Sequence, residues 1–106
     1  MIIKKVLVAD RIRHTGKSFC FIEHRFLTDG FLQSLTRHEL ALYLFLVLAS
    51  DKYGLSYYGD KSICSLLSLN EQDYLFARSC LIHKDLIVYD CTLFQVLSLP
   101  PSAHKM

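Results

Sequence analysis

The stretch Leu69–Tyr89, LNEQDYLFARSCLIHKDLIVY, constrains the fold of this chain more than any other part of the sequence. Asn70 is a good helix cap, so a helix is predicted over roughly residues 71–84. The apolar run Leu86–Tyr89 follows at once and has the β-branched content of a strand. One face of the helix is expected to pack inward, through Tyr74, Ala77 and Leu81. The pattern therefore predicts a helix that contributes to a core and leads directly into a strand.

A second helix is predicted upstream, where Thr36 and Glu39 have the spacing of a capping box. From Leu40 to Ala49 nearly every residue is apolar, which predicts a helix that is buried on all sides. This run is about half as long as the roughly 20 residues that a membrane span needs, so it is interpreted as a core helix and no membrane partner is expected.

Between these two helices the sequence predicts a short strand at Leu55–Tyr58 and a third helix capped by Asp60. The apolar face of this third helix would contain Ile63, Leu66 and Leu67. Beyond Tyr89, a turn over residues 90–92 and a second strand over residues 93–99 would complete a β-hairpin. The expected fold is mainly α-helical, with a three-helix core and a small β-hairpin wing.

Charge is unevenly distributed along the chain, although its net charge is only +2. Residues 1–25 carry six Lys or Arg against two Asp or Glu, whereas residues 26–106 carry six against eight. A basic N-terminal arm over residues 1–18 is therefore predicted before a domain over residues 19–99, with a tail over residues 100–106. The start of the domain, SFCFIEHRFL, is expected to be a strand or an extended segment. The arm holds five cations: Lys4, Lys5, Arg11, Arg13 and Lys17.

The segment LLSLNEQDYLFARSCLIHKDLIVY resembles the winged helix-turn-helix signature of many bacterial regulators and replication initiators. Those families usually place glycine in the turn and before the strand, whereas this chain has Ser68 and Asp85 there. Asp tolerates a left-handed backbone better than most residues, so the fold remains plausible at Asp85. The longer stretch over residues 21–58 looks like the N-terminal domain of phage and plasmid replication initiators and of DnaD-like proteins. It is also similar to small stand-alone helix-turn-helix proteins of bacterial mobile elements.

The resemblance implies double-stranded DNA binding, in regulation or in the replication or transposition of a mobile element. The helix over residues 71–84 would enter the major groove, where Gln72 would pair with adenine and Ser79 with a phosphate. Its other outward residues are acidic or apolar, and no Lys or Arg lies between Ile87 and Pro101. Because phosphate contacts need cations, the basic arm would have to supply them.

The alternative hypothesis is a protein-interaction or homodimerisation module on the same scaffold. Leu75 and Phe76 are expected to point outward from the helix, where an apolar patch suits a protein partner better than a phosphate. The N-terminal segment or the exposed edge of the hairpin would be other places for such a contact.

Catalysis, metal binding and a cofactor are not expected. The pairs Cys20/His24 and Cys80/His83 have helical spacing, but each pair offers only two of the four ligands of a structural zinc site. No set of nucleophile, base and orienting residue is apparent. The four cysteines form no Cys-x-x-Cys pair and the first residues do not resemble a signal peptide, which predicts free thiols in a reducing cytoplasm.

Overall fold

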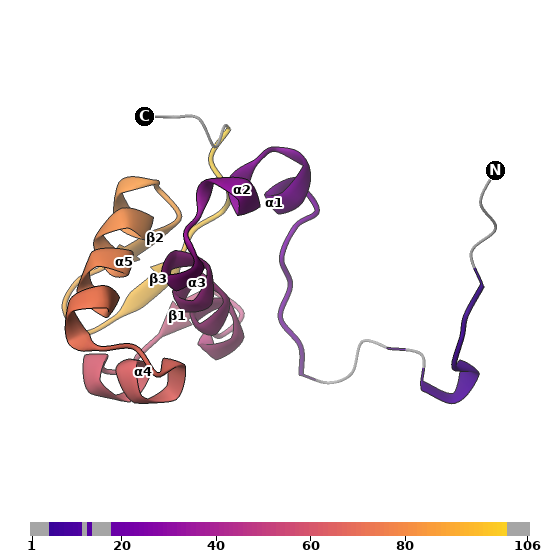
Figure 1. The fold of residues 1–106 in the computed structure, drawn as a ribbon, viewed down its shortest axis with the longest axis horizontal. Helices are drawn as coiled ribbons and strands as arrows, with labels where there is room; N and C mark the ends of the chain where they lie inside the picture. Colours follow the sequence, from indigo (N-terminus) through magenta and orange to yellow (C-terminus); the bar gives the residue numbers. More distant parts are fainter. Residues whose placement is uncertain (1–4, 12, 14–17, 102–106) are drawn as a thin grey trace.

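Helices and a small three-stranded antiparallel sheet form the body of the protein in the computed structural model, which describes residues 5–11, 13 and 18–101 (Figure 1). The elements, in chain order, are a 3-10 turn at Ala9–Arg11, α1 (Arg25–Thr28), α2 (Phe31–Ser34), α3 (Arg37–Ala49), β1 (Leu55–Ser56), α4 (Asp60–Leu67), α5 (Glu71–His83), β2 (Ile87–Tyr89) and β3 (Phe94–Val96). The expectation of a mainly helical chain with a small β-hairpin is confirmed.

The sheet joins the hairpin to the short strand between the helices. Its strand order is β1-β3-β2, so β3 pairs on one side with its hairpin neighbour and on the other with β1. The turn before β1 requires glycine, because Gly54 has a φ of 83° and a Cβ there would lie 2.7 Å from the carbonyl oxygen of Val96. The Val96 amide donates to the Gly54 carbonyl at 2.8 Å, which fixes β3 beside that turn.

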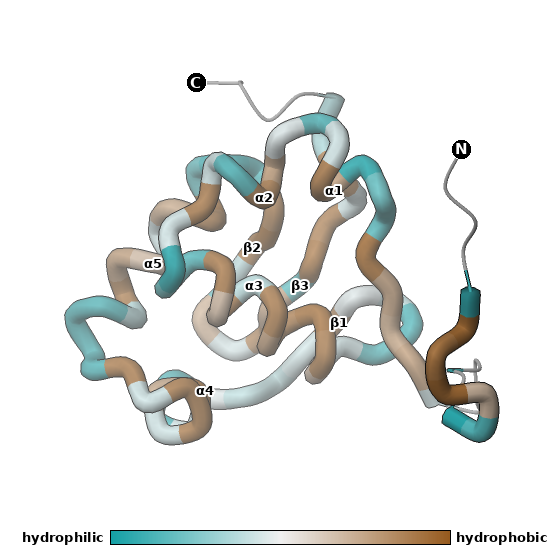
Figure 2. Tube along the Cα trace, turned by 45° about the vertical axis from the view of Figure 1, so that its right-hand side comes forward, coloured by the Kyte–Doolittle hydropathy of each residue, from teal (hydrophilic) through white to brown (hydrophobic). Residues whose placement is uncertain are grey.

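The core lies where α3, α4 and α5 meet the inner face of this sheet. Tyr74, Ala77 and Leu81 are all buried, so the predicted inward face of α5 is confirmed. They pack in one cluster with residues of α3, α4, β2 and β3, among them Leu42, Leu46, Ile63, Ile87 and Phe94. Figure 2 shows hydrophobic stretches of α3 beside the sheet that it contacts, with hydrophilic residues at the outer turns.

The helix starts follow the sequence closely, with one exception. Thr36 and Glu39 form the expected capping box on α3, and the Asn70 side chain accepts from the Asp73 amide at 2.7 Å. Asp60 does not cap α4: Gly59 occupies the cap position, and Asp60 is the first residue of the helix. Its carboxylate turns toward α5 because it accepts the hydroxyl hydrogen bond of Tyr74.

Two predictions of burial were wrong. The run Leu40–Ala49 is not buried on all sides, since Leu44 is exposed and Leu48 is 63% exposed. α3 has α5 and the sheet against one face, and the described part of the chain leaves the opposite face uncovered. On α4, Ile63 is buried and Leu67 partly buried, but Leu66 is 61% exposed because the helix meets the body along a narrower face than expected.

Ser68 and Asp85 take the left-handed backbone that glycine usually supplies at these two places, with φ values of 55° and 66°. Ser68 ends α4, and the following amide of Leu69 donates back to the carbonyl of Cys64 at 3.0 Å. This bond closes the turn between α4 and α5 in the manner of a Schellman cap. Cys91, in the hairpin turn, also has a positive φ of 79°, which the sequence had not indicated.

The N-terminal residues divide into two parts. Residues 5–11 stand apart from the helical body, whereas residues 18–23 run along it as an extended segment that leads into α1 (Figure 1). SFCFIEHRFL is therefore extended only in its first part, because α1 begins at Arg25. In the described residues, no helix has both the length and the apolar character needed to cross a membrane.

Candidate interaction surface

The outer face of α5 is the most distinctive surface of the described chain. Phe76 is 69% exposed there, and Leu75 and Ile82 are exposed beside it. Gln72 and Ser79, the two residues predicted to contact DNA from this helix, also lie on the outside. The helix thus presents apolar side chains around a small serine, with the acidic residues Glu71 and Asp73 in its first turn.

Arg78 is the one Lys or Arg within α5, and its side chain is held by contacts with Asp60 and Tyr89. Its Nη1 lies 3.3 Å from Oδ1 of Asp60, and its guanidinium stands over the ring of Tyr89, 4.5 Å from the ring centroid. The Tyr74 hydroxyl donates to the same Asp60 oxygen at 2.5 Å. Burial, and then this hydrogen bond, raise the pKa of Tyr74 above its ordinary value, so the phenol remains a donor.

Lys84, at the C-terminal cap of α5, is also held by the body. Its Nζ lies 2.7 Å from Oε1 of Glu39 and donates to the carbonyl oxygen of Ser34 at 2.6 Å. Glu39 is buried at the start of α3, and burial by itself would raise the pKa of its carboxyl group. The hydrogen bonds from Lys84 and from the Thr36 amide outweigh burial and lower that pKa below its ordinary value. Both cations of the helix and its cap are therefore paired with carboxylates of the body.

The predicted arm cations are not brought to α5. Lys5 and Arg11 are exposed on the segment 5–11 that stands apart from the body (Figure 1), Arg13 is also exposed, and Lys4 and Lys17 lie outside the described residues. Within the described part of the chain, none of these three cations forms an ion pair. The structure thus separates the positive charge of the arm from the apolar surface formed by Leu75 and Phe76.

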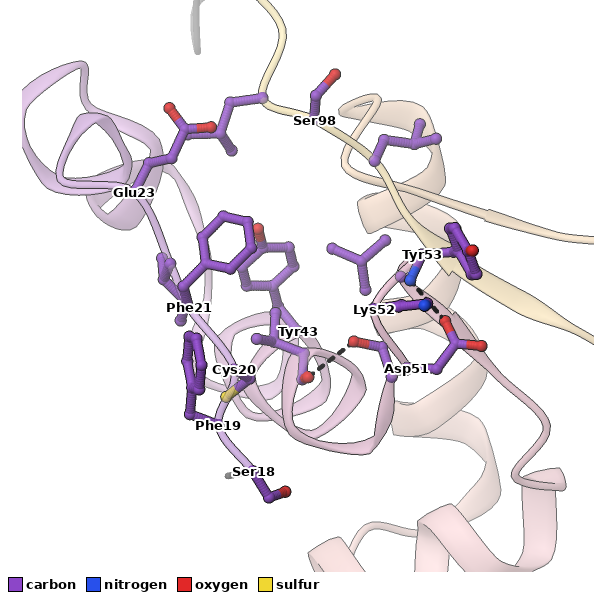
Figure 3. Close-up of a pocket in the computed structure, with 17 residues that line it drawn as sticks. Ser18, Phe19, Cys20, Phe21, Glu23, Tyr43, Asp51, Lys52, Tyr53 and Ser98 are labelled. Carbon is purple, nitrogen blue, oxygen red and sulfur yellow. Dashed lines mark hydrogen bonds between the residues drawn. The ribbon is translucent and has the colours of Figure 1, made fainter. Parts of the chain in front are cut away.

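A groove of about 650 Å³ lies on another side of the body, between residues 18–23 and the end of β3. Phe19 and Phe21 form one wall, and Tyr43 of α3 lies behind them (Figure 3). Asp51, Lys52 and Tyr53 lie across the opening, with Glu23 and Ser98 toward one end. The sequence had indicated an extended segment here, but not that it would leave a groove beside it.

The cysteines and histidines of the described residues were candidates for a metal site. In residues 5–11, 13 and 18–101, no three His, Cys, Asp or Glu side chains are close enough to hold an ion together. The four cysteines are free thiols, and burial raises the pKa of Cys64 and of Cys80, which keeps both protonated at neutral pH.

Sequence reasoning did not predict the ion pair that neutralises the charge of Arg78 on α5. The four-residue spacing of Tyr74 and Arg78 places them on one helix face, but the carboxylate of Asp60 comes from a different helix. It also missed Ile82 and His83, which extend the exposed face of α5 by one turn. Both omissions concern which side of a helix is covered, a property set by tertiary packing.

Comparisons of the chain with protein-family models, with curated proteins and with solved structures found no match in any of the three. The arguments for function therefore rest on the arrangement of the residues themselves.

Proposed function

We propose that this chain is a non-catalytic winged-helix protein that forms a homodimer through the outer face of α5. The element order α3, β1, α4, α5, β2, β3 supports the winged-helix assignment. Two helices joined by a tight turn and followed by a hairpin are the expected parts of such a domain, and β1 completes the sheet. A fold of this kind serves many functions, so the surface must decide among them.

The proposal rests on the exposed apolar side chains of the outer face of α5. Phe76 is 69% exposed, with Leu75 and Ile82 beside it, on a helix whose only Lys or Arg is engaged by Asp60. A helix that binds DNA in the major groove needs donors and cations toward the phosphates. Apolar side chains without free cations suit a protein surface instead.

A second copy of α5 fits this face well. In a two-fold interface with antiparallel helices, an axis at Ser79 brings Phe76 of one copy against Ile82 of the other, because both lie three positions from Ser79. The small side chain at the crossing lets the helices approach closely. Antiparallel helices also oppose their dipoles, which favours this orientation over a parallel one.

The test is the mass of the protein in solution, measured by sedimentation equilibrium. The wild-type chain is expected to be a dimer, and Phe76→Glu a monomer at the same concentration, because it places a charge in an apolar contact. Leu66→Glu is the matched control: Leu66 is 61% exposed on α4, and its substitution should leave the dimer intact. Both variants should keep the wild-type helical circular dichroism, because both side chains are exposed. A wild-type chain that stays monomeric at all concentrations contradicts the proposal, and leaves a different protein as the partner of this face.

Binding of double-stranded DNA is the second candidate function, and the basic arm favours it. Lys5, Arg11 and Arg13 are exposed and make no ion pair in the described residues. Such an arm would track phosphates, as arms do in other DNA-binding domains. The function would then be regulatory, or linked to replication or transposition of a mobile element. Because the arm and α5 are separate surfaces, this function is compatible with the dimer.

A further inference from the structure

The groove beside residues 18–23 is bordered by a strand-like segment whose backbone is unpaired. Residues 19–22 follow an extended path after a bend at Ser18 (Figure 1), and in the described part of the chain the backbone groups of residues 18–22 form no hydrogen bond with other backbone groups. Phe19 and Phe21 are exposed along this segment, beside an opening of about 650 Å³ (Figure 3). An unpaired extended segment next to an apolar groove is a site at which another strand can add.

The arm contains a segment with the properties of such a strand. Val6, Leu7 and Val8 are consecutive apolar residues, two of them β-branched, and Leu7 is 91% exposed. The structure holds them apart from the body (Figures 1 and 2). Val6 and Val8 are more than half exposed, as are Phe19 and Phe21, so bringing the two sets of side chains together would remove both from water.

The charges around the two surfaces are complementary. Lys5 precedes the apolar residues of the arm and Arg11 follows them. Glu23 and Asp51 are exposed on the lining of the groove. Lys52 also lines it, but its ammonium group stands over the ring of Tyr53, 5.3 Å from the ring centroid.

We propose that residues 6–9 of the same chain add as a strand to residues 19–22 and fill this groove, with Ala9 leaving the 3-10 turn that it begins when the arm stands apart. Ala9 and Ser18 are nine positions apart, which is ample for the chain to reverse, since hairpin loops need only about two to five residues. Pairing within one chain also brings the segment to the groove at a high effective concentration. The docked arm would then hold Lys5 and Arg11 against the body, beside Glu23 and Asp51.

Hydrogen–deuterium exchange of the full chain, followed by mass spectrometry, tests this proposal. The amides of residues 6–9 and 19–22 are expected to exchange at least about tenfold more slowly than unstructured peptide. In Leu7→Asp/Val8→Asp this protection should disappear from both segments. Adjacent strand residues point to opposite sides, so one of the two aspartates faces the groove whichever way the strand lies. The amides of α3 and α5 should keep their protection, which shows that the variant is folded.

The matched control is Leu66→Asp/Val88→Asp, two exposed apolar residues outside the groove, which should leave the protection of both segments unchanged. Exchange of residues 6–9 and 19–22 at the unstructured rate in the wild-type chain overturns the proposal. Repeating the measurement after tenfold dilution identifies the occupant. Protection that is independent of concentration supports docking within one chain, whereas protection lost on dilution assigns the groove to the arm of a second copy and overturns it.

Discussion

Asp60 determines the charge of the outer face of α5. Its Oδ1 accepts hydrogen bonds from Tyr74, Arg78 and Tyr89, which connect α4 to α5 and to β2. Arg78 also packs over the ring of Tyr89, so its long side chain is held against the body on two sides. Without this carboxylate, the guanidinium of Arg78 would be free to turn toward solvent. Asp60 of α4 therefore pairs with the one Lys or Arg within α5.

Glu39 makes the stability of the protein depend on pH. The carboxylate is buried and bonded to Lys84, and its pKa is lowered in the folded state. A group with a depressed folded pKa contributes stability above its unfolded pKa, and the contribution is lost as the pH falls through the folded value. The pair joins the start of α3 to the end of α5, so its loss weakens the contact between the two longest helices.

We expect Glu39→Gln to lower the free energy of unfolding by about 1–3 kcal/mol near neutral pH, because a charge-assisted hydrogen bond is lost while the glutamine can still cap α3. The difference from wild type should shrink as the pH falls below the ordinary pKa of a glutamate. Urea denaturation at neutral and acidic pH measures both effects. Glu71→Gln is the control, since Glu71 is exposed and unpaired in the described residues. A constant difference across the pH range would contradict the role given to Glu39.

At the scale of the elements, local signals predicted the helices well. Thr36 and Asn70 cap α3 and α5 through bonds between residues three apart, so the sequence alone contains the information. Leu48 and Leu66 were expected to be buried, yet they are exposed, because burial depends on which neighbour covers each face.

The candidate interaction surface could also be predicted only in part, because it too depends on how the helices pack. The outward position of Phe76 followed from helical spacing, but the capture of Arg78 by Asp60 requires the packing of α4 against α5.

The antiparallel arrangement of two α5 helices can be tested directly with a cysteine at the axis. Helix axes about 8–10 Å apart bring facing Cα atoms within roughly the 4.4–6.8 Å that a disulfide spans. In a background where the exposed Cys20 and Cys91 are replaced by serine, Ser79→Cys should form a disulfide-linked dimer on mild oxidation. Non-reducing electrophoresis measures the cross-linked fraction.

Ser65→Cys, at another exposed serine, on α4, is the control for this cross-link and should remain largely monomeric on the gel. Equal cross-linking of the two variants would indicate random collision and would remove Ser79 from the axis. That result would not contradict the proposed dimer, because the effect of Phe76→Glu on the mass in solution does not depend on where the two-fold axis crosses α5.

At the scale of the whole molecule, the proposed dimerisation and the proposed DNA binding would reinforce each other. A dimer formed through α5 would not cover the arms, and it would link two sets of arm cations in one particle. The second arm of such a dimer would bind at a high effective concentration, so the expected affinity of the dimer for DNA exceeds that of either arm alone. Three cations of the body, Arg25, Arg78 and Lys84, are paired with carboxylates and should contribute little to this attraction.

Binding to random duplex DNA should therefore weaken steeply with salt. Each phosphate contact contributes about 0.9 to the slope of log affinity against log salt, so replacing Lys4, Lys5, Arg11 and Arg13 by alanine should reduce it by roughly 3 to 4 per bound arm. Lys61→Ala, on the exposed surface of α4, should change the slope by at most about 1. Phe76→Glu should weaken binding and reduce the slope to about half, because a monomer brings one arm. Fluorescence anisotropy across a salt series measures all four proteins, and the absence of binding at low salt would exclude the arm as a DNA anchor.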